Sequence, residues 1–236
     1  MNTDFTFAEA SNRWMLAIDT STEQAGLALG DGERLIARSW DAGRTQTTSI
    51  LPVIAEMMGE ADIESRDLAA VGVATGPGTF TGLRVGLSIA KGFVLAQGVP
   101  IVGVPTLEIA AASFEPGTPL VAVLSAGRGR VVWQRFGNEA DSAPANTTVP
   151  ELIETLASTP DALVTGELAE SHRVTIEAAH PRVDWRPRDP AILLWLARDR
   201  WRRGLVDDPV TLEPTYLHGV TVTAGPVQDR LRRSGE

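Results

Sequence analysis

Two short segments contain the residues whose types and spacing could do chemistry. In the first, Asp19, Thr20 and Ser21 directly follow a short apolar run. A carboxylate at the end of a strand can hold a hydrated magnesium ion, while hydroxyls and turn amides face a phosphate. The same residue types also form capped turns, in which Asp and Ser accept hydrogen bonds from local backbone amides. The segment by itself is compatible with a phosphate site and with a capped turn.

The second segment is the glycine-rich stretch from Gly76 to Gly86, which includes Gly78. A glycine-rich turn between a buried strand and a helix places free amides and the positive end of the helix dipole near an anion. The stretch lacks the Gly-Lys-Ser/Thr of a Walker loop and the register of a dinucleotide fingerprint. Glycine also serves in sharp turns, because it accepts backbone angles that other residues avoid. Both interpretations remain open.

Other catalytic groups are poorly represented. The chain has no cysteine, which excludes disulfides, thiolate zinc sites and cysteine nucleophiles. His172, His180 and His218 lack ligand-like spacing, so we expect no metal site. The Gly-x-Ser-x-Gly frame of a nucleophile elbow is missing around Ser125, and no serine hydrolase arrangement is expected.

Composition narrows the class of protein further. The 236 residues are 43% hydrophobic and 22% charged, which is typical of a globular protein. A formal net charge of -9 disfavours a large direct contact with nucleic-acid phosphates. No apolar run approaches the roughly 18 residues that cross a bilayer, and residues 1–13 do not resemble a secretory signal. We therefore expect a cytoplasmic protein without membrane contact.

The alternation of apolar runs and turns predicts an α/β fold. In the first half we expect three antiparallel strands followed by alternating helices and strands, over residues 15–18, 25–29, 35–40, 49–58, 68–74, 79–97, 101–104 and 106–113. Pro52 fits the helix over 49–58 only if it lies in the first turn.

The second half opens, like the first, with a strand, a turn and a strand. The expected elements are strands over 120–124 and 131–136, a polar loop over 138–148, a helix over 150–157, a strand over 162–165 and a helix over 191–203. Two lobes that each open in this way are the plan of the actin, hexokinase and Hsp70 superfamily (ASKHA). We therefore predict a two-lobed fold in which each mixed sheet is flanked by helices. The predicted boundaries are a disordered leader over 1–13, lobes over 14–116 and 117–218, and a flexible tail over 219–236.

Two of the predicted helices carry more apolar residues than a helix needs to cover one face of the sheet in a monomer. The helix over 79–97 has Arg84 and Lys91 as its only charged residues. Burial by the chain's own second lobe and docking of another chain both account for this. A docking face would include Ile50, Ile54, Met57, Gly82, Val85, Gly86, Ile89, Ala90 and Phe93.

Basic residues near the end of the second half suggest one further site. Arg182, Arg186 and Arg188 alternate with Trp185 and prolines. Such a segment is compatible with an edge that touches RNA and with a solvated loop.

Three segments in this order and spacing resemble the TsaB (YeaZ) family. They are residues 16–21, 76–86 and 102–107, and residues 213–217 are similar to the family's closing segment. The resemblance implies an actin-like fold and a non-catalytic scaffold subunit that forms a homodimer when alone. Its partners would be the catalytic paralogue TsaD and the ATPase TsaE, with contacts through the helices over 49–58 and 79–97.

The complex implied by this resemblance transfers a threonylcarbamoyl group to N6 of adenosine 37 in ANN-decoding tRNAs, forming threonylcarbamoyladenosine (t6A). The chain would contact tRNA only indirectly. It would keep a vestigial nucleotide or phosphate site at Asp19, Thr20, Ser21, Gly76 and Gly78, with weak ATP, ADP or Mg²⁺ binding at most and mainly in the partner.

The alternative interpretation of the sequence is that the chain is an enzyme. An ATP-dependent small-molecule kinase or carbamoyl-transfer enzyme of the same superfamily would use Asp19. Such an enzyme holds its metal–nucleotide with groups from both lobes, and the matching place in the second hairpin is Ser125. The His-x-x-x-His metal pair of the catalytic paralogue is also missing from the sequence.

Overall fold

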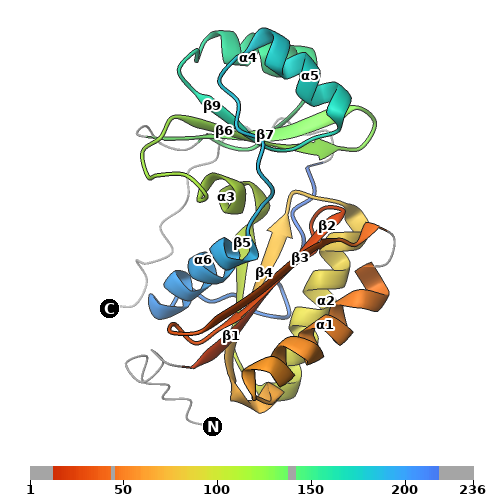
Figure 1. Cartoon of the computed structure of the whole chain (residues 1–236), viewed down its shortest axis with the longest axis vertical. Helices are drawn as coiled ribbons and strands as arrows, with labels where there is room; N and C mark the ends of the chain where they lie inside the picture. The colour runs from red at the N-terminus through yellow and green to blue at the C-terminus, as the bar shows by residue number, and fades with distance from the viewer. Residues whose placement is uncertain (1–12, 44–45, 138–141, 218–236) are drawn as a thin grey trace, which may run out of the picture.

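The computed structural model describes residues 13–43, 46–137 and 142–217. The expected leader up to residue 12, the tail over 219–236 and His218 lie outside the described residues. The described chain forms two lobes, each built on its own sheet (Figure 1). Among the described residues, no helix is both long and apolar enough to cross a membrane.

A five-stranded mixed sheet forms the centre of the first lobe. Its strands are β1 (Trp14–Asp19), β2 (Gln24–Gly30), β3 (Leu35–Asp41), β4 (Leu68–Gly76) and β5 (Ile101–Pro105), in the order β3-β2-β1-β4-β5. β2 is antiparallel to β1 and β3, whereas β4 is parallel to β1 and β5. Every residue of β1 and β4 is buried, because helices cover both faces of the sheet. This confirms the predicted hairpin opening and the predicted doubly covered strand.

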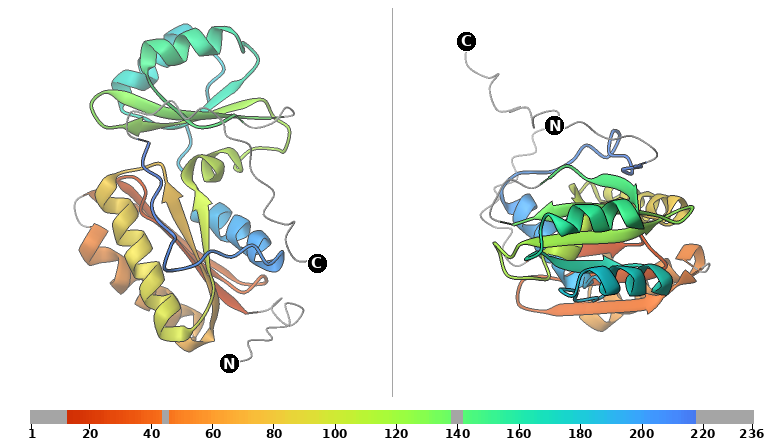
Figure 2. Two further views of the ribbon diagram at one scale, coloured as in Figure 1. Left: turned by 180° about the vertical axis from the view of Figure 1, so that it is seen from behind. Right: turned by 90° about the horizontal axis from the view of Figure 1, so that it is seen from above.

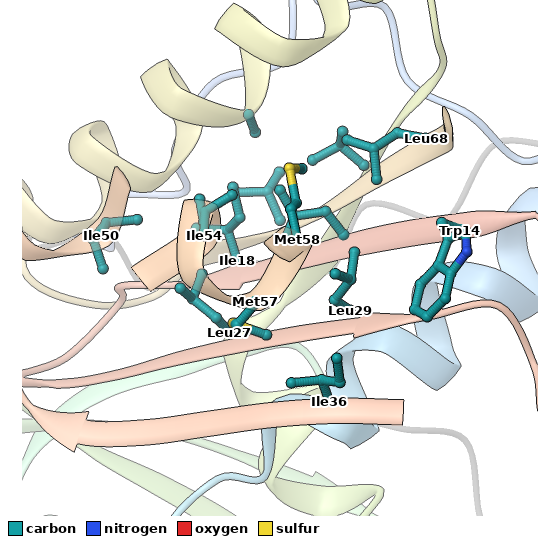
Figure 3. Close-up of a cluster of buried hydrophobic side chains, with 14 of the residues drawn as sticks. Trp14, Ile18, Leu27, Leu29, Ile36, Ile50, Ile54, Met57, Met58 and Leu68 are labelled. Atoms are coloured by element: carbon teal, nitrogen blue, oxygen red, sulfur yellow. The ribbon is translucent and has the colours of Figure 1, made fainter. Parts of the chain in front are cut away.

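Helices α1 (Gln46–Ala61) and α2 (Phe80–Gln97) cover one face of this sheet (Figures 1 and 2). α2 begins after Thr79, whose hydroxyl oxygen accepts a hydrogen bond from the Gly82 amide, and ends at Gly98 in the left-handed conformation. α1 begins earlier than residue 49, so Pro52 lies inside the helix and not in its first turn. Proline removes one intrahelical hydrogen bond. α1 nevertheless continues, because Ile50 and Ile54 on either side of Pro52 are buried in the core (Figure 3).

The opposite face of the first sheet is covered by α6 (Pro190–Arg202) and in part by α3 (Thr106–Ala111). Leu193 and Ala197 of α6 pack in one cluster with Met15 and Ala17 of β1. After α6 the chain runs back along the first lobe (Figure 2), where Asp207 pairs with Ile101. The predicted second lobe over 117–218 is therefore wrong at its C-terminal end. A sheet with two apolar faces needs a second helical layer, and α6 supplies it from far along the sequence.

The second lobe contains a smaller mixed sheet in the order β8-β7-β6-β9, with helices on it (Figure 1). Its elements are β6 (Leu120–Ala126), β7 (Arg130–Phe136), β8 (Ala145–Thr148), α4 (Val149–Ala157), β9 (Leu163–Glu167) and α5 (Glu170–Ala179). The hairpin of β6 and β7 confirms the predicted repeat of the first lobe. β8 lies where a loop was predicted over 138–148, and α5 was not predicted. β8 is a polar edge strand, and α5 buries only Ile176, so neither carries a clear apolar period.

Candidate functional site

β1 delivers Asp19 to the junction between the two lobes. The Asp19 side chain is buried, and its Oδ1 accepts hydrogen bonds from the Ser21 amide at 2.9 Å and from the Ser21 hydroxyl at 2.6 Å. The Thr20 hydroxyl donates to the Gly82 carbonyl of α2 at 2.6 Å. The predicted capped turn is therefore present, and its hydroxyls are bonded within the chain.

The glycine-rich stretch lies directly against this turn. The Thr79 amide donates to the Ser21 carbonyl at 2.7 Å, and the Gly76 amide donates to the Thr106 hydroxyl at 3.1 Å. A Cβ atom at position 78 would collide with the Ser21 backbone, and Gly76 has a φ of +106°. Glycine is therefore required here for close packing and backbone angle. The tertiary structure brings the two predicted segments together, with these amides bonded to the chain itself.

The cation beside Asp19 comes from the opposite end of the sequence. Arg188 lies just before α6, and its Nε donates to Oδ2 of Asp19 at 2.8 Å. Both side chains are almost fully buried, with 3% and 4% of their surface exposed. Burial alone raises the pKa of Asp19, but the charge of Arg188 and the hydrogen bonds from Arg188 and Ser21 outweigh it and lower the pKa. Asp19 is therefore held as a paired carboxylate.

Glu167 extends this ion pair into the second lobe. It ends β9, and its Oε1 lies 2.7 Å from Nη1 of Arg188. Its Oε2 accepts a hydrogen bond from the Thr22 hydroxyl at 2.7 Å, and Nη2 of Arg188 lies 3.2 Å from the same hydroxyl oxygen. We call Asp19, Thr22, Glu167 and Arg188 the Arg188 cluster. It joins the two lobes through an ion pair and partly buried, charge-assisted hydrogen bonds.

Sequence reasoning missed the Arg188 cluster. A solvated loop and an RNA-touching edge were the two interpretations of the arginines near Trp185, and both are wrong for Arg188. Arg186, only two residues earlier, is exposed and pairs with Asp184. The one local signal is Asp189 followed by Pro190, which caps and begins α6 and so fixes the backbone immediately after Arg188.

An open cavity of about 780 Å³ lies beside the cluster at the lobe junction. Thr22 and Glu167 of the cluster line it, as do Thr79 and Ser125. The Ser125 hydroxyl oxygen accepts a hydrogen bond from the Ala169 amide at the start of α5, so it serves as a local cap. Among the described residues, no three His, Cys, Asp or Glu side chains gather as a metal-binding group.

Six of the nine predicted docking residues are buried in this chain's own core. Ile50, Ile54 and Met57 of α1 point toward the sheet (Figure 3). The remaining members of the six are the small residues Gly82, Gly86 and Ala90 of α2, which are also buried. A Cβ atom at position 86 would collide with the Thr20 hydroxyl. The small residues therefore let α2 approach β1, and the prediction that these six residues contact a partner is wrong.

The other three predicted residues, Val85, Ile89 and Phe93, are only partly buried. On the same helix, Leu95 is 75% exposed, and an added Cβ at Gly92 would meet no atom of the described residues within 4 Å beyond its chain neighbours and the helix's own backbone. We call Val85, Ile89, Gly92, Phe93 and Leu95 the outer side of α2. Ile89 and Phe93 still pack in part against the core, and Ser88 and Lys91 lie two turns and one turn before Leu95 on the same helix, so this side is apolar only in part.

An exposed aromatic side chain at the start of α2 contacts an arginine of the same helix. Phe80 is 51% exposed, and the Arg84 guanidinium lies 3.8 Å from the centre of its ring. Nε of Arg84 donates to the Tyr216 hydroxyl at 3.0 Å, and the Thr215 amide donates to the Thr75 carbonyl at 2.7 Å. The segment after α6 is thereby held against α2 and β4.

Two lobes that each open with an antiparallel hairpin and continue into a parallel strand define an actin-like fold. Among solved structures, YeaZ from Pseudomonas aeruginosa superimposes with a TM-score of 0.72 at 23% identity, over 87% of this chain and 100% of that one. This similarity concerns the fold.

Comparison with known protein sequences shows the family to which the chain belongs. The model of the family described as tRNA N6-adenosine threonylcarbamoyltransferase (TsaD) matches residues 40–184. The tRNA threonylcarbamoyladenosine biosynthesis protein TsaB of Escherichia coli is 33% identical over 52% of this chain and 54% of its own length. TsaB of Bacillus subtilis is 32% identical over 50% and 52%. The chain therefore belongs to this family, and its similarity to proteins named TsaB agrees with the resemblance seen in the sequence. The matches span about half the length of these relatives.

Proposed function

We propose that the chain is a partner subunit in t6A synthesis, which acts by pairing with TsaD and does not transfer the threonylcarbamoyl group itself. The names of its TsaB relatives and its match to the TsaD family support the pathway. The proposal includes TsaE as a further member of the complex, indirect contact with tRNA, and a cytoplasmic location. It also includes self-pairing of the chain when TsaD is absent.

The outer side of α2 is the single observation that carries the pairing. Leu95 is 75% exposed although α2 packs its other side on the sheet. Leu51 of the neighbouring helix α1 is also exposed. Burying one leucine side chain contributes about 1.5–3 kcal/mol, so a partner that covers Leu95 and Leu51 would gain from burying both. A second helix laid on this side would cover these residues.

Gly92 favours a helical occupant of this surface. A glycine inside a helix costs about 0.5–1 kcal/mol relative to alanine, and no other described part of the chain fills the space above Gly92. A helix from another chain can approach closely where a side chain is missing. The sheet-facing Gly86 has a different role, because its space is already filled by Thr20.

The geometry at Asp19 supports a non-catalytic role. Both carboxylate oxygens accept hydrogen bonds from Ser21 or Arg188. A kinase that uses Asp19 needs this carboxylate available for a hydrated metal. The alternative of a small-molecule kinase is therefore not favoured.

Capture of TsaD from the same organism tests the pairing. We expect Leu95→Glu to abolish co-purification with TsaD and to stop t6A formation by the reconstituted system. Val174→Glu is the matched control, because Val174 of α5 is 54% exposed on the second lobe. Both variants should melt at the wild-type temperature. Unchanged TsaD capture by Leu95→Glu would contradict the proposed surface.

A second measurement tests the division of labour. Without TsaD, the purified chain should form no t6A on tRNA, and addition of TsaD and TsaE with threonylcarbamoyl-adenylate should restore synthesis. In sedimentation, the isolated chain should be a dimer that Leu95→Glu converts to a monomer. Turnover by the isolated chain would contradict the non-catalytic assignment.

A further inference from the structure

The actin-like fold raises the question of whether the Asp19 turn fits a metal–nucleotide complex. A bound Mg²⁺ needs carboxylate oxygens that are free to hold it or its water molecules. Oδ1 of Asp19 accepts two hydrogen bonds from Ser21, and Oδ2 accepts one from Arg188. A positive charge already lies where the metal would be needed. The residues therefore do not fit a metal at this position.

We propose that the guanidinium of Arg188 stands in for a metal cation beside Asp19 and thereby closes the lobe junction of this chain to metal–nucleotide complexes. Arg188 is a specificity-determining residue in this view, because it decides which ligands the Asp19 turn can accept. The inference rests on the Arg188 cluster alone and does not depend on the pairing through α2.

Burial and geometry show that the guanidinium occupies a built position. Its side chain is 3% exposed, and its nitrogens lie 2.8 Å from Asp19 and 2.7 Å from Glu167. The Arg188 amide also donates to Oε1 of Glu167 at 3.1 Å. An arginine held at backbone and side chain in this way cannot swing aside without leaving two carboxylates without a counter-charge, which is costly in a buried site.

Charge balance gives a second reason for exclusion of a nucleotide. The Arg188 cluster contains two carboxylates and one guanidinium, so its formal charge is negative. Glu23 and Asp41 also line the adjoining cavity. The Arg173 guanidinium on this wall lies 3.6 Å from Glu170, and Arg186 pairs with Asp184. A triphosphate entering without its metal would therefore meet carboxylates and already paired cations.

The cluster also ties the lobes together without a ligand. Asp19 and Thr22 belong to the first lobe, Glu167 ends β9 of the second, and Arg188 begins the connection to α6. In a metal–nucleotide enzyme the ligand itself joins the lobes. Here side chains of the protein itself form the connection, so the two lobes are joined without a nucleotide.

Binding of Mn²⁺, measured by electron paramagnetic resonance with and without ATP, tests the inference on the full chain. We expect wild type to retain no Mn²⁺ at this site and to show no melting shift with Mn²⁺–ATP. Arg188→Gln should retain a single Mn²⁺ and melt at a higher temperature when Mn²⁺ is added. The double variant Asp19→Asn/Arg188→Gln should lose both effects.

Arg186→Gln is the matched control, because it removes an exposed guanidinium from the same cavity wall and should behave like wild type. If Arg188→Gln is unfolded in chelator, recovery of the fold on addition of Mn²⁺ is the expected result, and failure to recover overturns the inference. A folded Arg188→Gln that retains no Mn²⁺ also overturns it. Binding of Mn²⁺–ATP by the wild-type chain that is lost in Asp19→Asn would likewise overturn the inference.

Discussion

The variant Gly86→Ala tests whether Gly86 is needed for packing inside the chain or for contact with a partner. In Gly86→Ala the new Cβ would lie on the Thr20 hydroxyl, which donates a 2.6 Å hydrogen bond to the Gly82 carbonyl. The helix must move or this hydrogen bond must break. The docking interpretation predicts instead that bulk at position 86 weakens pairing and leaves the monomer folded.

The expected magnitude follows from three contributions. Loss of the buried hydrogen bond costs about 0.5–1.5 kcal/mol, and overpacking costs about 1–3 kcal/mol. Alanine in place of glycine inside a helix returns up to about 1 kcal/mol. We therefore expect Gly86→Ala to lower the free energy of unfolding by about 0.5–4.5 kcal/mol.

Gly92→Ala on the same helix is the control with the opposite sign. Within the described ranges, no atom outside the neighbouring helix backbone lies within 4 Å of a Cβ at position 92, so the variant should gain up to about 1 kcal/mol from helix propensity alone. Urea denaturation of both variants measures the difference, and the slope of the transition should stay unchanged.

A double variant isolates the cause of the Gly86 effect. Thr20→Ala removes the hydroxyl that the new methyl would meet, so Gly86→Ala should cost less in a Thr20→Ala background than in wild type. Equal costs in both backgrounds, or a stable Gly86→Ala, would refute the view that α2 is packed on β1 through its small residues.

The remaining predictions concern acid stability and the second helical layer. The pKa of Asp19 is lower in the folded chain than its ordinary value, so its stabilising contribution is present above pH about 4. That contribution is lost as the pH falls through the lowered pKa, and acid titration of Asp19→Asn should lack this part of the slope. In α6, Leu193→Ala should cost about 2–5 kcal/mol in urea denaturation, because Leu193 is fully buried. Trp195→Ala should be nearly neutral, because Trp195 is 61% exposed; a large loss there would contradict the placement of α6.

Local patterns in the sequence were enough for much of the fold. The hairpin at Gly30-Asp31-Gly32, the apolar strand from residue 68 and the helix over 79–97 were all predicted, because each depends on neighbours in the chain. The repeated hairpin at residue 120 likewise led to the two-lobed architecture. The Asp19 turn and the glycine-rich stretch were also recognised as the two segments that could form a site.

Tertiary structure alone decided what these segments do. The sequence shows a glycine at position 86 but does not show that α2 packs closely on β1 at this position. Arg188 is 169 positions from Asp19, and no local period or spacing connects the two residues. α6 could be predicted as a helix, but its cover of the first sheet depends on how the chain returns from the second lobe. Burial and pairing of distant groups come from packing in three dimensions, and packing determines that Asp19 meets a guanidinium of its own chain.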